Sequence, residues 1–330
     1  CRKLINRLGA WRCLVVKSEY KDANESLYKA GKETTKTSVY SAEYVPIAGL
    51  VRLADVKYYD PAKEKKVLSS ISKLNEKLGG YGLGQLSIWT GTSGKSTFLG
   101  QELVYAIKQG YSVMAYSGEL PAALFRHWIE LQAAGPKDVE QSINTETGFT
   151  TYKPTFEIQK QIRTWYAPYF YLLDSFGDVT SANMLEVFEY AARRHGCQVF
   201  LVDNLMTTSF SGAKDDFYRK QSEFIGQLID FANRYTVHVH IVAHPRKQDG
   251  RLTKNDVGGS GDITSRAHKV FAIHKLAEPE EIAKYQCASL LTILKDRMTG
   301  VENYDIKLQF EPNSKRFWRK ETGANFKLWG

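Results

Sequence analysis

The sequence predicts an α/β fold built on a mostly parallel central sheet with an antiparallel edge. From about Val67 onward, short β-rich runs alternate with amphipathic helical patterns, the order expected of a parallel sheet covered by helices. The last three runs follow one another without helices between them, which is typical of an antiparallel edge. A chain of 330 residues is long enough to bury one large core of this kind.

Each element follows from a local pattern. A predicted strand is a short apolar run bounded by glycine, proline or polar residues, and a predicted helix has apolar residues at helical spacing. The predicted strands cover residues 85–90, 112–117, 169–174, 198–203, 236–243, 269–274, 288–295 and 304–310. The predicted helices cover residues 95–109, 120–134, 155–165, 181–195 and 215–235. The apolar runs are far shorter than the ~20 residues that cross a bilayer, so no membrane partner is expected.

Two shorter segments precede this domain, which we place at residues 67–330. Residues 1–33 are basic and mixed, and they are expected to be the end of a preceding domain. Residues 34–66 are rich in Thr, Ser, Lys and Tyr and predict a linker with a short helix over Ile47–Leu53. That helix would pack either on a neighbouring subunit or on its own domain. Because the chain begins with Cys1, we expect a fragment of a longer protein.

Residues 86–98 predict a phosphate-binding loop, because a strand-like run breaks at glycine, reaches Gly-Lys-Ser-Thr and continues into a helical pattern. Lys95 would reach the β and γ phosphates, and the Ser96 hydroxyl would ligate Mg²⁺. The spacing is about two residues shorter than G-x-x-x-x-G-K-[ST], since Trp89 stands where the first glycine is expected. The predicted nucleotide-binding residues are Gly91, Ser93, Gly94, Lys95, Ser96 and Thr97.

Carboxylates follow three of the predicted strands, at the sheet edge where α/β proteins bind ligands. Glu119 would accept a proton from the water that attacks the γ phosphate, and the alternative is a carboxylate that stabilises a helix N-terminus. Asp203 is the preferred Mg²⁺ ligand. Asp174 competes for that assignment, but we assign it to a helix cap or a turn.

The strand 236–243 carries two histidines and leads to a third. His238 and His240 share one face of the strand, but no acidic or cysteine partner has suitable spacing for a metal site, so we favour simple packing. His244 stands at the end of the strand, where it would hydrogen-bond the γ phosphate and report its loss to the following loop.

Positive charge gathers in two polar loops, at residues 207–220 and 246–265. The chain has 45 basic and 36 acidic residues and a formal net charge of +9, which suits a polyanionic partner. The loops would grip the phosphates of single-stranded DNA without reading bases, and the alternative is solvated loops without a ligand. The predicted DNA-binding residues are Lys214, Arg219, Lys220, Lys247, Arg251, Lys254, Gly259 and Ser260.

A further basic pair, Lys295 and Arg297, lies at the end of the strand 288–295. We assign it to a finger that points into a neighbouring subunit's site and stabilises transition-state charge there. Taken alone, such a pair is more often a surface ion pair.

Six segments in this order resemble the helicase domain of DnaB-type replicative helicases, especially Twinkle and phage primase-helicases. They are residues 82–97, 117–121, 199–205, 241–247, 259–263 and 294–300. The likeness covers about residues 67–320. Near the front, residues 12–25 look like the last strand and tail of a primase-type TOPRIM domain.

The resemblance implies a RecA-like P-loop NTPase fold that uses ATP, or another NTP or dNTP, with Mg²⁺. It also implies a homo-oligomeric ring, expected to be a hexamer, that hydrolyses nucleotide at subunit interfaces and moves 5′ to 3′ on single-stranded DNA. It assigns water activation to Glu119, Mg²⁺ to Asp203, γ-phosphate sensing to His244, and the trans-acting role to Lys295 and Arg297. Primase and DNA polymerase are the implied partners. The TOPRIM remnant lacks an acidic centre, so this chain should not synthesise primers.

Other functions remain open on the same fold. A RecA-type recombinase or a clock-type ATPase would form filaments or bind protein, and a non-hydrolysing assembly module would bind nucleotide without turnover. Four cysteines, at positions 1, 13, 197 and 287, form no C-x-x-C pair, which favours a reducing compartment. We expect the cytoplasm of a bacterium or of a phage-infected host, with an organelle as the alternative.

Overall fold

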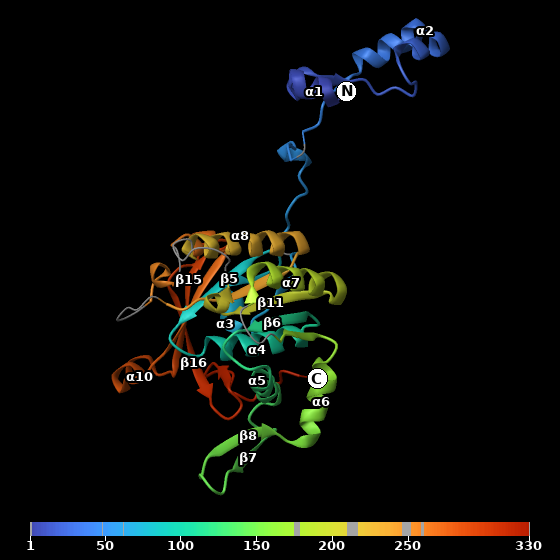
Figure 1. Ribbon diagram of the computed structural model, residues 1–330. Helices are drawn as coiled ribbons and strands as arrows, with labels where there is room; N and C mark the ends of the chain where they lie inside the picture. Colours follow the sequence, from blue (N-terminus) through green and yellow to red (C-terminus); the bar gives the residue numbers. More distant parts are fainter. Residues whose placement is uncertain are drawn as a thin grey trace. The chain divides into compact units, whose positions relative to one another are not determined.

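The computed structural model describes residues 2–47, 49–61, 63–174, 179–209, 217–245, 252–258 and 261–329. The chain divides into two compact units, Cys1–Lys63 and Glu64–Gly330 (Figure 1). The division lies close to the start of the predicted α/β domain.

The first unit is small and mostly helical. Its elements are α1 (Arg2–Leu8), η1 (Ala10–Arg12), β1 (Leu14–Val15), α2 (Ala23–Tyr40), β2 (Glu43–Tyr44) and η2 (Leu53–Asp55). The Asp22 side chain caps α2 by accepting a hydrogen bond from the Glu25 N–H, at 2.9 Å. α2 changes direction at Gly31, whose φ is 82°, and runs across the boundary that the sequence predicts after Glu33.

The helix predicted over Ile47–Leu53 is not formed by the described residues of that stretch. Gly49 has a φ of 86°, which a right-handed helix does not contain. The only helical turn described there is η2, which begins at Leu53. The apolar residues of the stretch are therefore exposed, and Leu50 and Leu53 are 75% and 87% accessible.

The second unit is organised around a nine-stranded sheet with the order β17-β16-β15-β14-β5-β13-β11-β6-β9. Its strands are β5 (Leu86–Gly91), β6 (Ser112–Ser117), β9 (Phe170–Leu173), β11 (Cys197–Asp203), β13 (His238–Val242), β14 (Lys269–Lys275), β15 (Ser289–Asp296), β16 (Tyr304–Glu311) and β17 (Arg316–Trp318). Strands β9 to β14 are parallel, whereas β15, β16 and β17 are antiparallel. The predicted mostly parallel sheet with an antiparallel edge is confirmed.

Helices cover both faces of this sheet (Figure 1). They are α3 (Ser72–Leu78), α4 (Lys95–Lys108), α5 (Ala122–Ala134), α6 (Phe156–Tyr166), α7 (Ser181–His195), α8 (Phe217–Tyr235), α9 (Gly261–Arg266) and α10 (Pro279–Tyr285). Apolar residues of α3, α4, α5 and α6 form one core with the sheet, and those of α7 and α8 form a second core. Neighbouring residues of β5 alternate between the two cores, since Trp89 belongs to the first and Ile88 to the second.

Several short elements escape the sequence pattern. A hairpin of β7 (Val139–Ile143) and β8 (Thr150–Pro154) lies between α5 and α6, and its residues are mostly polar and exposed. Smaller pairs join β3 (Lys66–Val67) to β4 (Tyr81–Gly82) and β10 (Val179–Thr180) to β12 (Thr208–Ser209). No helix in the described part of the chain is long and apolar enough to cross a membrane.

Candidate active site

The phosphate-loop segment joins β5 to α4 through only three residues, Thr92, Ser93 and Gly94. Gly91, with a φ of 126°, lies so close to β14 that a Cβ atom would come within 1.9 Å of the Ile273 carbonyl oxygen. The Thr92 N–H donates to that same oxygen at 3.1 Å. The short loop is therefore packed directly against β14, and only glycine fits at position 91.

Lys95 begins α4, and its side chain folds back over the loop. Its Nζ donates to the Gly91 and Thr92 carbonyl oxygens at 2.9 and 3.1 Å. Burial lowers the pKa of the Lys95 amine, while the charges of Asp203 and Glu119 oppose that shift. Lys95 is 6% exposed and lies in the field of both predicted catalytic carboxylates. The predicted loop residues Ser96 and Thr97 occupy the first turn of the same helix.

Asp203 ends β11 and is fully buried. Among the described residues, neither of its carboxylate oxygens has a hydrogen-bond partner. Burial raises the pKa of Asp203 to about 6, and the nearby Ser96 hydroxyl and Lys95 amine offset part of that rise. A buried carboxylate without partners is costly unless a ligand satisfies it. Its hard oxygens, beside a serine hydroxyl and a helix N-terminus, therefore suit Mg²⁺ and a bound nucleotide phosphate.

Glu119 and His244 come together at the same end of the sheet. His244 Nε2 lies 2.8 Å from Glu119 Oε1. Both side chains are about half exposed, at 45% for His244 and 42% for Glu119. Glu119 follows β6 and His244 follows β13, so the two strands that flank β11 bring them together.

Sequence reasoning missed Asn204, the third member of this cluster. Its Nδ2 donates to Glu119 Oε1 and lies 2.8 Å from His244 Nε2. Asn204 is 1% exposed. The available signal was its position directly after Asp203, because successive residues at a strand end point to different sides and can serve one site from two directions.

The competing carboxylate, Asp174, lies elsewhere. It follows β9, the strand at the edge of the sheet, and it is exposed. Asp203, in contrast, lies close enough to Lys95, Glu119 and His244 for their charges to affect its pKa.

The basic pair at the end of β15 does not join this cluster. Lys295 Nζ donates to the carbonyl oxygens of Thr264, Ser265 and Ala267 at 2.8 to 3.1 Å. Arg297 Nη2 donates to the Ser265 oxygen at 2.5 Å. These carbonyls lie at the C-terminal end of α9, where cations are favourable. Within the described chain, the hydrogen bonds of the pair therefore lead to α9 and not to the phosphate loop.

Only part of the predicted DNA-binding set can be placed. Arg219 and Lys220 lie in the first turn of α8, and Arg219 pairs with Glu223 at 2.6 Å. Lys254 lies in η5 (Lys254–Asp256) and pairs with Glu302 at 3.4 Å. Lys214, Lys247, Arg251, Gly259 and Ser260 fall outside the described residues.

His238 and His240 are buried and hydrogen-bonded. His238 contacts Ser87 and Gly82, and His240 Nδ1 accepts from the Trp89 indole at 3.1 Å. Across the described ranges, no three His, Cys, Asp or Glu residues gather as a cluster that could hold a metal ion. The packed interpretation of these two histidines agrees with this geometry.

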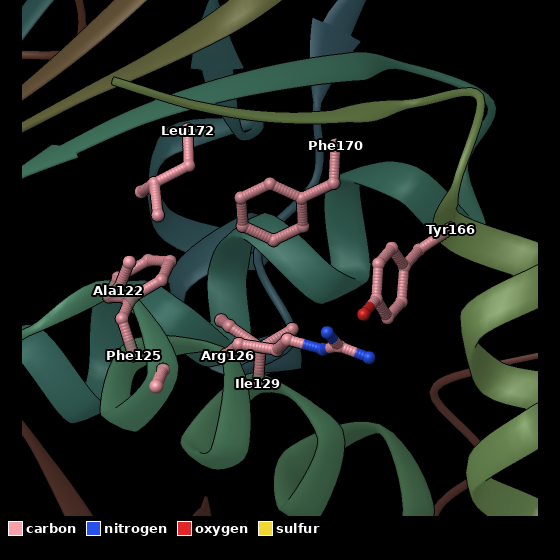
Figure 2. A pocket seen from close by; sticks show the side chains of 8 residues that line it. Ala122, Phe125, Arg126, Ile129, Tyr166, Phe170 and Leu172 are labelled. Atoms are coloured by element: carbon pink, nitrogen blue, oxygen red, sulfur yellow. The ribbon is translucent and has the colours of Figure 1, made fainter. Parts of the chain in front are cut away.

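A hollow of about 280 Å³ lies between α5, α6 and β9, apart from this site. Figure 2 shows Phe170 and Tyr166 on one side of it, with Arg126 and Ile129 on the other. None of the predicted site residues lines it. Two of its wall residues, Arg126 and Tyr166, also donate to the buried Glu130 carboxylate, at 2.8 and 3.0 Å.

Comparisons with solved structures agree on the fold. The ATPase domain of a DnaB-like helicase superposes with a TM-score of 0.64 and 16% identity over 78% of this chain and 92% of that one. A DnaB-like replicative helicase, studied with its primase interactions, gives 0.63 and 16% over 78% of this chain and 64% of its own length. This chain has a RecA-like ATPase fold. The KaiC-like protein PH0186 from Pyrococcus horikoshii OT3 shares it more distantly, with a TM-score of 0.52 and 16% identity over 76% of this chain and 97% of that one. No protein-family model matches the chain.

Proposed function

We propose that this chain is the motor domain of a ring-shaped replicative DNA helicase that hydrolyses NTP at its subunit interfaces. The observation that carries the proposal is the grouping of Lys95, Asp203, Glu119 and His244 at one edge of a sheet with the fold of DnaB-like ATPase domains. Asp203 is the strongest element, since its buried carboxylate lacks a partner in the described chain.

Each residue has a defined task in this proposal. Lys95 exchanges its loop carbonyls for the β and γ phosphate oxygens of the nucleotide, and the amide groups at the start of α4 hold the same phosphates. Asp203 and Ser96 hold Mg²⁺, which neutralises phosphate charge when it is bound. Glu119 orients the attacking water and takes its proton. His244, which contacts Glu119, senses whether the γ phosphate is present.

The remaining residues extend the proposal to the assembly. Lys295 and Arg297 stabilise transition-state charge in the neighbouring subunit's site, since their contacts in this subunit lead to α9. Residues 207–220 and 248–262 contact single-stranded DNA, including Arg219, Lys220 and Lys254. The ring moves 5′ to 3′, is a hexamer, and works with primase and DNA polymerase. Residues 1–33 are the tail of a TOPRIM-like domain, and residues 34–66 are a linker that packs against the adjacent subunit.

NTP turnover tests the proposal. We expect Mg²⁺-dependent hydrolysis that single-stranded DNA stimulates, and we expect Lys95→Ala and Arg297→Ala each to reduce it by about 100-fold or more. The matched controls are Lys108→Ala, on the last turn of α4, and Arg193→Ala, an exposed arginine of α7. Turnover that survives in both test variants would refute the proposal.

A clock-type ATPase is the second candidate, because the KaiC-like protein shares the fold. That function requires protein binding and does not require strand separation. Hydrolysis without unwinding of a forked duplex would favour it.

A further inference from the structure

Asn204 has every polar atom of its side chain engaged, although it is neither a phosphate-loop residue nor a predicted metal ligand. Its Nδ2 contacts Glu119 and His244, as described above. Its Oδ1 accepts from the Met206 and Thr207 N–H groups at 2.8 and 3.2 Å, which caps the turn η3 (Leu205–Thr207). One buried amide therefore joins the candidate catalytic carboxylate to the backbone of a turn.

The turn is locked to the Glu119 segment by further contacts. The Gly118 N–H donates to the Asp203 carbonyl at 2.6 Å, and the Thr207 hydroxyl donates to the Asn204 carbonyl at 2.9 Å. A Cβ atom at Gly118 would lie 2.0 Å from Thr207 Oγ1, so the two segments touch without space for a side chain. The Tyr116 hydroxyl donates to the Thr207 carbonyl at 3.2 Å. Movement of the turn must therefore change the position of the segment that carries Glu119.

Hydrogen-bond chemistry indicates which state this arrangement represents. An ionised carboxylate only accepts hydrogen bonds, and here Glu119 Oε1 receives the Asn204 amide and lies 2.8 Å from His244 Nε2. A general base must instead direct its oxygen at the water whose proton it takes. Lys95 is also turned onto its own loop carbonyls. The arrangement is that of a resting site.

We propose that Asn204 is a positioning residue that restrains Glu119 until the turn η3 moves. The inference rests on the proposed function and deepens it. Residues that follow the turn contain the proposed DNA contacts Arg219 and Lys220, so a strand held there pulls on η3. The amide of Asn204 moves with the turn, because Met206 and Thr207 hold its oxygen. Glu119 Oε1 is then free to accept a proton from water, and DNA binding is coupled to hydrolysis.

The test is Asn204→Ser, compared with Asn233→Ser on the exposed face of α8. Serine is a good N-cap and still accepts from the turn, but its side chain is too short to reach Glu119. We expect DNA-free kcat to rise by about fivefold, the factor that corresponds to a hydrogen bond of ~1 kcal/mol. KM for nucleotide stays unchanged, and the ratio of DNA-stimulated to DNA-free turnover falls by the same factor. Asn204→Asp, which keeps the cap but loses the donor, serves as a second variant if the first does not fold.

Two results would overturn the inference while the proposed function stands. One is an unchanged stimulation ratio in both variants. The other is an equal loss of turnover with and without DNA, which is the result of a purely structural role. If the wild-type chain turns over no faster than Lys95→Ala, the proposed function itself fails and this inference fails with it.

Discussion

His238 should make the protein acid-sensitive because it is buried in its neutral form. The side chain is 0% exposed, and its Nδ1 lies 2.8 Å from the Gly82 carbonyl oxygen, which can only accept a hydrogen bond. Nδ1 therefore carries the hydrogen, and Nε2 accepts from the Ser87 hydroxyl at 2.9 Å. Burial lowers the pKa of His238 from 6.5 to about 3; the bond to Gly82 opposes this shift, and the charges of Lys269 and His268 add to it.

The sign and size of the effect follow from that shift. The unfolded chain binds a proton at His238 below a pKa of 6.5, whereas the folded chain binds it only near a pKa of about 3. The stabilisation is therefore complete above about pH 6.5 and is lost as the pH falls toward about 3. Between about pH 7.5 and pH 5, the loss amounts to ~2 kcal/mol of unfolding free energy, at 1.36 kcal/mol for each pH unit below 6.5.

Urea unfolding of the wild type and His238→Gln at these two pH values measures the effect. Glutamine does not titrate, so the variant should lose ~2 kcal/mol less than the wild type on acidification, although it is less stable at both pH values. The control is His195→Gln, at an exposed position near the end of α7, which should follow the wild type. Equal acid sensitivity of the wild type and His238→Gln would show that the reasoning about burial is wrong.

Three further predictions concern the core, the loop and the metal ligand. Glu130 has a side chain 2% exposed and accepts from Arg126, Arg163, Gln159 and Tyr166; these bonds outweigh burial and lower its pKa, so its stabilisation is present at neutral pH and lost in acid. Glu130→Gln should therefore cost about 3 kcal/mol in urea unfolding at neutral pH and flatten the acid limb, and an unchanged unfolding curve would contradict this. Gly91→Ala, which places Cβ 1.9 Å from the Ile273 oxygen, should lower the melting temperature far more than Gly110→Ala, where φ is also positive but no atom lies within 4 Å. Equal losses would mean that β14 does not confine the loop. Because the pKa of Asp203 is about 6, the Mg²⁺-dependent part of nucleotide affinity should fall about tenfold for each pH unit below 6, and Asp203→Asn should lack this dependence. Fluorescent-nucleotide titrations with Mg²⁺ and with EDTA measure it, and parallel pH profiles for both proteins would exclude Asp203 as the ligand.

The sheet could be predicted because its strands are apolar on both faces and therefore stand out as continuous runs. β5, β6, β11 and β13 begin and end within two residues of their predicted bounds. The hairpin of β7 and β8 was not predicted, since its strands are short, polar and supported mainly by each other. The predicted helix over Ile47–Leu53 was wrong because its apolar spacing outweighed Gly49 in our reasoning.

The candidate site was predictable where one residue type marks a strand end. Glu119, Asp203 and His244 each follow an apolar run, and the parallel order of β6, β11 and β13 brings them to one edge. The contacts between them were not predictable, because they depend on rotamers and on register. Asn204 illustrates this, since an asparagine after a strand has no pattern that separates a turn cap from a link to a carboxylate. The return of Lys95 to its own loop carbonyls likewise follows from the short loop in three dimensions.

Unwinding of a forked DNA duplex with a 5′ single-stranded tail tests the central claim most directly. The account predicts strand separation that requires NTP and Mg²⁺, fails on a fork with only a 3′ tail, and is lost in Lys95→Ala but retained in Lys108→Ala. Turnover of NTP by the wild type without any strand separation would contradict the helicase assignment.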